Sequence, residues 1–289
     1  MNTTSRRQFL KASAAAAAIS TLGGAGRLAA KPLRQPIGLQ LYSVRELLGK
    51  DFEGTLAKVR ATGITVVEAA GYYGRTAADF RKAMDNAGLR CVSTHHTLKL
   101  LQTELDQWID YGHTLGLEYI VCSSSGGVHR DPAAKGGPTL DDWRYIATEF
   151  NRVGEKVKAA GMTFGIHNHT PELAQFDAVN VYDELLRLTD PGLVIFEMDA
   201  GWVHASGHDP VAYLTKSPAR FPLMHVKDMV AQPDGKQLMT VIGKGSIDYK
   251  PILRAATGLQ YYFIEQEAFE MEPIEEIRLD AAYITSLNL

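Results

Sequence analysis

The chain has 289 residues, of which 45% are hydrophobic and 22% are charged, as in an ordinary globular protein. Its formal net charge of -3 provides no broad positive field, so we expect a small molecule rather than nucleic acid or an anionic membrane surface as its partner. Two cysteines are too few for a disulfide framework, so one hydrophobic core must stabilise the fold; the oligomeric state is left open.

The first thirty residues differ in composition from the rest of the chain. Arg6 and Arg7 precede an apolar run of small residues over 12–22. This order is typical of a twin-arginine export signal, and the run is shorter than the roughly 18 to 20 residues that a membrane span needs. We predict a signal peptide over 1–30 and a periplasmic or secreted mature protein without stable membrane anchoring.

From Gly38 onward the chain repeats one unit, in which a helix-like stretch and a glycine precede a short apolar run that ends in a polar residue. Strands are predicted at 38–42, 65–68, 90–94, 118–122, 163–167, 193–198, 221–225 and 261–265. Helices are predicted over 51–62, 76–87, 100–115 and 141–160, where apolar residues recur at helical spacing. Left-handed helix C-caps are expected at Gly63, Gly88, Gly116, Gly161, Gly192 and Gly258.

Apolar strands that alternate with helices indicate a parallel sheet whose outer face is covered. Eight such units close a barrel, so the predicted fold class is α/β, a single (β/α)8 barrel over 31–289. An open doubly wound sheet is the alternative. It is less favoured, because the first predicted strand is not followed by a glycine-rich phosphate loop.

Polar residues gather where the predicted strands end, and in a closed parallel barrel these ends meet at one rim. They are Glu68, His95, His96, His167, His169, Glu172, Asp199, His225, Lys227, Asp228, Glu265 and Glu267. Several carboxylates at one rim would be costly to desolvate without a counter-ion. Mixed nitrogen and oxygen ligands suit Mn²⁺, Mg²⁺, Co²⁺ or Zn²⁺, so we predict a divalent metal ion there.

The motifs that contain these residues resemble those of the sugar phosphate isomerase/epimerase superfamily, the xylose isomerase-like barrels. They are residues 38–45, 67–71, 167–173, 198–202, 205–210, 225–228, 243–245 and 265–266, and they span the mature chain. The resemblance implies a xylose isomerase-like barrel whose metal is held by a strand-5 Glu, a strand-6 Asp, a strand-7 His and a strand-8 Glu. Asp199, His225 and Glu265 match the last three.

Strand 5 departs from the pattern of that superfamily, because His167 stands where the epimerases have Glu. Two alternatives are open: His167 is itself the metal ligand, or Glu172 folds back to replace the missing carboxylate. We prefer His167. The departure also weighs against a symmetric epimerase mechanism with two glutamate bases.

The chemistry that fits is proton abstraction next to a carbonyl, with a metal ion to stabilise an enediolate-like intermediate. His169 is the first candidate base and Glu265 the second. Lys227 is expected to neutralise an oxyanion or donate to a leaving oxygen, unless it pairs with Asp228. The expected substrate contacts are Glu68, His95, Glu172 and Trp202, although Glu68 could instead close a strand by a salt bridge.

We therefore predict a metal-dependent isomerase or epimerase acting on a non-phosphorylated sugar, keto-sugar or glycoside, because phosphorylated sugars are largely cytoplasmic. One alternative is a lyase or hydrolase that eliminates the aglycone of 3-keto-glycosides. Another is an exported sugar-binding protein without catalysis, in which Tyr72, Tyr73, Trp143 and Trp202 would stack on sugar rings. The charge balance and the export signal oppose a DNA-repair endonuclease of the same superfamily.

The two cysteines are expected to remain free. Cys91 lies near the start of the third predicted strand and Cys122 near the end of the fourth, an offset of about three residues, or on the order of 10 Å. A disulfide requires Cα atoms closer than about 7 Å. We predict two buried thiols that pack as small apolar groups.

Overall fold

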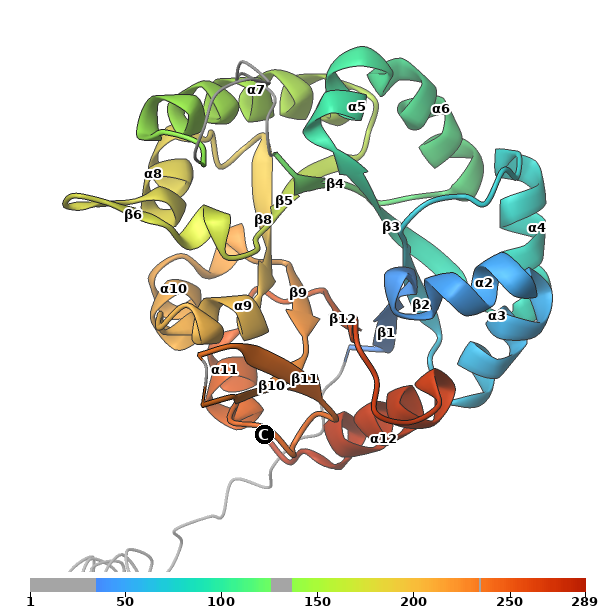
Figure 1. The fold of residues 1–289 in the computed structure, drawn as a ribbon. Helices are drawn as coiled ribbons and strands as arrows, with labels where there is room; N and C mark the ends of the chain where they lie inside the picture. The colour runs from blue at the N-terminus through green and yellow to red at the C-terminus, as the bar shows by residue number, and fades with distance from the viewer. Residues whose placement is uncertain (1–34, 126–136, 234) are drawn as a thin grey trace, which may run out of the picture. The chain divides into compact units, whose positions relative to one another are not determined.

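The computed structural model describes residues 35–125, 137–233 and 235–289, so the predicted signal over 1–30 lies outside the described residues. Within them, eight parallel strands close into a barrel, and helices surround it on the outside (Figure 1). Each barrel strand pairs with the next one along the chain, and the last pairs with the first. The predicted (β/α)8 barrel is confirmed.

The barrel strands lie close to the eight predicted ones. They are β1 Ile37–Gln40, β2 Val66–Ala69, β3 Arg90–Thr97, β4 Tyr119–Ser124, β5 Thr163–His167, β8 Val194–Asp199, β9 Leu223–Val226 and β12 Tyr261–Ile264. The first predicted strand, 38–42, continues beyond Gln40, where β1 ends. The Gln40 side chain accepts a hydrogen bond from the Tyr42 N–H and caps the 3-10 turn η1 (Leu41–Val44), which ends β1 at Gln40.

The helices follow the strands around the barrel. They are α2 Arg45–Lys50, α3 Phe52–Ala61, α4 Ala77–Ala87, α5 Leu98–Thr103, α6 Leu105–Leu115, α7 Leu140–Ala159, α8 Val181–Leu188, α9 Ala200–Ala205, α10 Pro210–Lys216, α11 Tyr249–Ala255 and α12 Pro273–Ser286, with the 3-10 turns η2 Pro171–Leu173 and η3 Pro218–Arg220. The helix predicted over 100–115 is divided into α5 and α6, because Glu104 (φ -133°, ψ 19°) leaves the helical conformation. Two antiparallel hairpins lie outside the barrel sheet: β6 Gln175–Phe176 with β7 Val179–Asn180, and β10 Asp228–Ala231 with β11 Gln237–Thr240.

The predicted left-handed glycines are confirmed at four of the six positions. These are Gly63, Gly88, Gly116 and Gly161, with φ values of 98°, 69°, 74° and 82°. Gly192 and Gly258 are not among the positive-φ residues of the described chain, so the prediction is wrong there. α8 already ends at Leu188, with Thr189 as its C-cap. A Cβ atom on Gly258 would lie 2.2 Å from the Pro218 carbonyl oxygen, so close packing is what requires a glycine at that position.

The barrel interior changes from apolar to polar along the strands. Its apolar cluster is made by Val66, Val92, Tyr119, Val121, Leu223, Tyr261 and Phe263. Alternate residues of a strand point to the same face, so the residues two positions after Val66, Leu223 and Phe263 also point into the barrel. Those residues are Glu68, His225 and Glu265, and all three are buried. The apolar layer thus forms a floor beneath a polar rim.

Both cysteines are free and buried, as predicted. Cys122 is level with His96 on the neighbouring strand, so its offset from Cys91 is larger than expected. Cys91 and Cys122 both belong to the core between the barrel and its helices.

Candidate functional site

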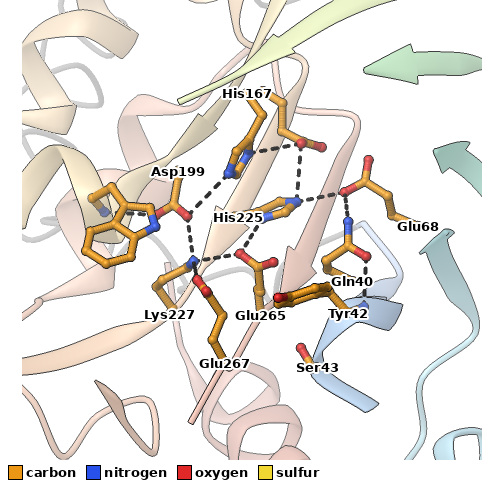
Figure 2. Close-up of polar contacts among 12 residues, drawn as sticks. Gln40, Tyr42, Ser43, Glu68, His167, Asp199, His225, Lys227, Glu265 and Glu267 are labelled. Carbon is orange, nitrogen blue, oxygen red and sulfur yellow. Dashed lines mark hydrogen bonds and ion pairs between the residues drawn. The ribbon is translucent and has the colours of Figure 1, made fainter. Parts of the chain in front are cut away.

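The strand register brings the polar residues of β5, β8 and β9 side by side. His167 is level with Glu197, and Asp199 is level with His225. Figure 2 shows His167, Asp199, His225 and Glu265 pointing toward one another from four different strand ends. Residues that are far apart in the sequence therefore form one buried cluster.

His225 lies at the centre of this cluster and is fully buried. Its Nδ1 atom lies 3.0 Å from Glu265 Oε2, and its Nε2 atom lies 2.8 Å from Glu68 Oε1 and 3.2 Å from Glu197 Oε2 (Figure 2). Burial lowers the pKa of His225, but the Glu197 and Glu265 carboxylates outweigh burial and raise this pKa well above its usual value. In the absence of a metal ion, the ring is therefore held as a cation between carboxylates.

Lys227 also points into the cluster. Its ammonium Nζ lies 2.8 Å from Asp199 Oδ2, 2.6 Å from Glu265 Oε2 and 3.1 Å from Glu267 Oε1 (Figure 2). Burial opposes the charged form, but the Asp199, Glu265 and Glu267 carboxylates raise the pKa of Lys227 above its usual value. The ammonium is therefore a fixed positive charge at the rim.

The alternative in which Lys227 merely pairs with Asp228 is wrong. Side chains alternate along the chain, so Lys227 follows His225 into the barrel while Asp228 points the other way. The Asp228 carboxylate accepts hydrogen bonds from backbone N–H groups, at 2.9 Å from Gly243 and 3.0 Å from Gly245. Asp228 holds the loop that follows β11.

The predicted ligand set could hold a divalent ion. His167, Asp199, His225 and Glu265 each offer one ligand atom, and these atoms all lie within 4.8 Å of one another. His167 Nε2 faces Asp199 Oδ2 at 3.8 Å, while its Nδ1 atom lies 3.2 Å from Glu197 Oε2. The buried nitrogen and oxygen donors of this set are ligand types that suit a divalent ion.

Glu172 lies apart from this ligand set. Its carboxylate accepts hydrogen bonds from the His169 N–H at 2.9 Å and from Ser125 Oγ at 3.2 Å. Glu172 is not a member of either buried group that could hold a metal among the described residues. Its contacts position the turn that carries His169.

A second group, formed by His95, His167, Glu197 and His225, was missed in part by the sequence analysis. Glu197 Oε2 lies 2.7 Å from His95 Nε2 and 3.2 Å from His167 Nδ1. Burial raises the pKa of Glu197, but His225 and His95 outweigh burial and lower it well below its usual value. Glu197 lies two positions before Asp199 on the same strand, and this spacing was the signal that could have revealed it.

Glu68 is placed as the salt-bridge alternative expected, with His95 and His225 as its partners at 2.9 Å and 2.8 Å. It is fully buried and hydrogen-bonds Gln40, Ser93 and His225. It is not among the residues that line the main cavity, and it makes no salt bridge with a lysine or arginine of the described chain. Glu68 therefore holds His95 and His225 in place through these contacts.

The main cavity opens over this cluster and has a volume of about 860 Å³. Its polar side is formed by His95, His167, His169, Glu265 and Glu267. Burial and the nearby Lys227 ammonium lower the pKa of His169 to about 4, so the ring is neutral and able to accept a proton. The carboxylates of Glu68 and Glu197 overcome burial and raise the pKa of His95 to about 9.

Of the aromatic residues that the sequence suggested as sugar contacts, only some line the cavity. Trp202 donates its backbone N–H to Asp199 Oδ1 at 2.9 Å, and its ring lies 5.3 Å from Lys227 Nζ, but it does not line the main cavity. Trp143 is buried in the core beneath α7, so a stacking role there is wrong. Tyr73 packs against Phe52 away from the cavity lining, whereas Tyr72 lines it.

A sequence profile described as "Xylose isomerase-like TIM barrel" matches residues 56–287. The chain belongs to this family. Xylose isomerase-like relatives include an inosose dehydratase of Clostridium beijerinckii, 27% identical over 236 residues that cover 72% of this chain and 78% of that protein. An inosose dehydratase of Lacticaseibacillus casei is 26% identical over 274 residues, 83% of this chain and 91% of that protein.

A crystal structure of a sugar phosphate isomerase/epimerase from Parabacteroides distasonis is also similar. Its sequence is 25% identical, its TM-score is 0.72, and the match covers 92% of this chain and 98% of that one. The findings together support an enzyme of the xylose isomerase-like superfamily. Both inosose dehydratases are named for a lyase reaction rather than for an isomerisation.

The N-terminus matches a profile for the twin-arginine translocation signal over residues 3–23, which indicates export across the membrane. Among the described residues, no helix combines the length and apolar character that a membrane crossing requires.

Proposed function

We propose that the protein is an exported, metal-dependent enzyme that removes a proton next to the carbonyl of a non-phosphorylated keto-sugar or glycoside. The observation that carries this proposal is the buried convergence of His167, Asp199, His225 and Glu265 beside a cavity that the neutral His169 also lines. We expect the enzyme to act in the periplasm or outside the cell. Such a cluster exceeds what a sugar-binding protein without chemistry would need.

The four residues of this cluster would hold the divalent ion, and a bound ion would supply stabilisation of negative charge on the substrate oxygen. His169 acts as the base, because its uncharged ring lies at the cavity surface and about 4.7 Å, centroid to centroid, from the His167 ring. Lys227 is buried and does not line the cavity, so it would act from behind the metal ligands, as a positive charge beside Asp199 and Glu265 that favours negative charge on the substrate oxygen. His95 can donate to a substrate hydroxyl from the same side of the cavity.

The described residues that line the cavity offer no built phosphate clamp, which favours a non-phosphorylated substrate. Among the described residues that line the cavity, the one guanidinium is that of Arg75, and its Nη1 atom pairs with Glu53 at 2.8 Å. A phosphate group would need several free donors or cations. The buried Lys227 is already paired with three carboxylates.

Two outcomes are open to the intermediate that proton removal creates. Return of the proton to a carbon gives isomerisation or epimerisation. In a 3-keto-glycoside, the proton leaves C2, the electron pair forms the C1–C2 double bond, and the C1–O bond breaks, so that the aglycone departs as an alcohol after protonation. The dehydratase relatives favour this second candidate, a lyase, because loss of water from a keto-sugar is the same type of elimination.

The proposal is tested by NMR in D₂O with a panel of free keto-sugars and 3-keto-glycosides, with added Mn²⁺, Co²⁺ or Zn²⁺ or with a chelator. We expect deuterium incorporation or aglycone release that depends on the metal. Asp199→Asn should remove both metal binding and turnover while it retains the oxygen that caps Trp202. Full turnover by Asp199→Asn, or tight sugar binding with neither reaction in the unmodified protein, would contradict the proposal.

A further inference from the structure

The cavity continues beyond the metal-binding cluster to four aromatic side chains, which we call the aromatic wall: Tyr72, His96, Trp108 and Tyr111. They come from the segment after β2, from β3 and from α6. Tyr72 is stacked on Trp108 with ring centroids 5.6 Å apart, and Tyr111 lies 4.0 Å from Tyr72. His96 lies 4.5 Å from Trp108. The wall is therefore one packed surface of rings.

The two tyrosine hydroxyls of the wall have partners within the protein. Tyr72 shares a hydrogen bond of 2.8 Å with Thr94 Oγ1, and Tyr111 donates to the Arg75 carbonyl oxygen at 3.1 Å. These hydroxyls are anchors for the rings. A ligand does not need to satisfy them.

Two other polar atoms of the wall have no such partner. Trp108 Nε1 and His96 Nε2 are buried and make no hydrogen bond with the described residues. His96 is only 6% exposed, yet it lines the cavity. Both atoms are shielded from solvent and from the cavity, so the wall presents ring surface rather than these polar atoms to a ligand.

The size of the cavity supports an occupant larger than one sugar ring. Its volume of about 860 Å³ lies near the upper end of the roughly 300 to 1,000 Å³ typical of pockets that bury drug-sized ligands. Metal-binding His167 and the wall residue Trp108 both line it. One ligand can therefore contact the cluster and the aromatic wall at the same time.

We propose that the aromatic wall is an aglycone subsite, which binds a planar aromatic group attached to the sugar at the metal cluster. The substrate class is then an aryl glycoside or its keto form. Rings prefer to pack offset or edge-on against other rings, so the wall favours an aromatic group over an aliphatic one. This inference rests on the proposed function for the sugar end of the ligand.

The test is calorimetric binding of phenyl glucoside and methyl glucoside to the metal-loaded protein. We expect the phenyl compound to bind at least tenfold more tightly than the methyl compound. Trp108→Ala should abolish this preference with little change for methyl glucoside, and Trp108→Phe should retain most of it. Tyr111→Phe is the matched control, because it keeps the ring and removes a hydroxyl that is bonded to the protein; its dissociation constants should be unchanged.

Equal affinity of the unmodified protein for both glucosides would overturn the aglycone subsite. The subsite would also be overturned if folded Trp108→Ala or Trp108→Phe lost the same factor of affinity for both glucosides. The readout needs no turnover, so its outcome is separate from that of the proposed function. A preference that depends on Trp108, found without metal-dependent proton exchange or aglycone release, would support the subsite and overturn the proposed chemistry.

Discussion

The ammonium of Lys227 lies 2.8 Å from the Asp199 carboxylate, and the same carboxylate belongs to the group that could hold a metal ion. A divalent ion and the ammonium would therefore compete for the oxygen atoms of Asp199. The lysine acts as an internal cation for Asp199 and Glu265 when no ion is bound. This relationship links metal affinity to the charge-stabilising role that we propose for Lys227.

The first prediction follows from this competition. Lys227→Met should bind the divalent ion roughly tenfold more tightly, about 1.4 kcal/mol, because the Asp199 and Glu265 carboxylates lose their cation. Turnover should nevertheless fall, because no ammonium remains beside the metal ligands to favour negative charge on a substrate oxygen. Calorimetric metal titration and steady-state kinetics measure the two effects, with Lys50→Met on the exposed surface as a control. Unchanged metal affinity would show that the two cations do not compete.

The second prediction concerns the ligand from β5. His167→Ala should lower metal affinity by tenfold or more, because it removes one of four ligand atoms that lie within 4.8 Å of one another. Glu172→Ala should leave metal affinity nearly unchanged and reduce turnover, because Glu172 accepts the backbone N–H of His169. The opposite pattern in metal titrations would identify Glu172 as the ligand.

The third prediction concerns pH and stability. Burial raises the pKa of Asp280 to about 7, so the folded chain retains a proton that the unfolded chain releases near pH 4. The stability that this proton confers is complete below about pH 4 and is lost as the pH rises through about 7. Asp280→Asn does not ionise, so its free energy of unfolding at pH 8.5 should exceed that of the unmodified protein by roughly 2 to 4 kcal/mol.

This difference should shrink toward zero at about pH 3, where Asp280 is largely protonated in both states. Urea unfolding at both pH values provides the measurement. The exposed Asp106→Asn is the control, and it should show no such pH-dependent gain. A gain for Asp280→Asn that is equal at both pH values would mean that ionisation of this carboxyl is not the cause.

The fourth prediction concerns the cysteines. Thiol titration of the denatured, unreduced protein should find two reactive groups, because both cysteines are free. The native protein should react slowly, since burial raises the pKa of Cys91 to about 12 and raises that of Cys122 as well. Finding no thiol, together with a mass two hydrogens lower, would show that the strand register of β3 and β4 is wrong.

The secondary-structure boundaries show where sequence patterns lose information. Apolar runs located all eight strands, but the end of β1 depends on a hydrogen bond from the Tyr42 N–H to the Gln40 side chain. Gly258 was predicted to be a left-handed C-cap, which is wrong. A glycine is required there because the Pro218 carbonyl oxygen, from another part of the chain, leaves no room for a Cβ atom.

The candidate site shows the same division between local pattern and long-range geometry. Asp199, His225 and Glu265 were predictable, because each ends or follows a strand and all strand ends of a barrel meet at one rim. Glu197 was missed, although its spacing from Asp199 indicates the same inward face. The contacts of Glu68 with His95 and His225 could not be predicted, since they depend on the strand register of the barrel.

The sequence by itself determined the barrel and the residue types at its rim, because strand alternation, helical spacing and strand-end position are local properties that a single pattern records. Only the tertiary structure decided which partners these residues have. Lys227 faces three carboxylates rather than Asp228, and Trp108 joins Tyr72 beside the cavity, through contacts between segments far apart in the chain. Such pairings depend on strand register and helix packing, which are set by the closure of the whole barrel.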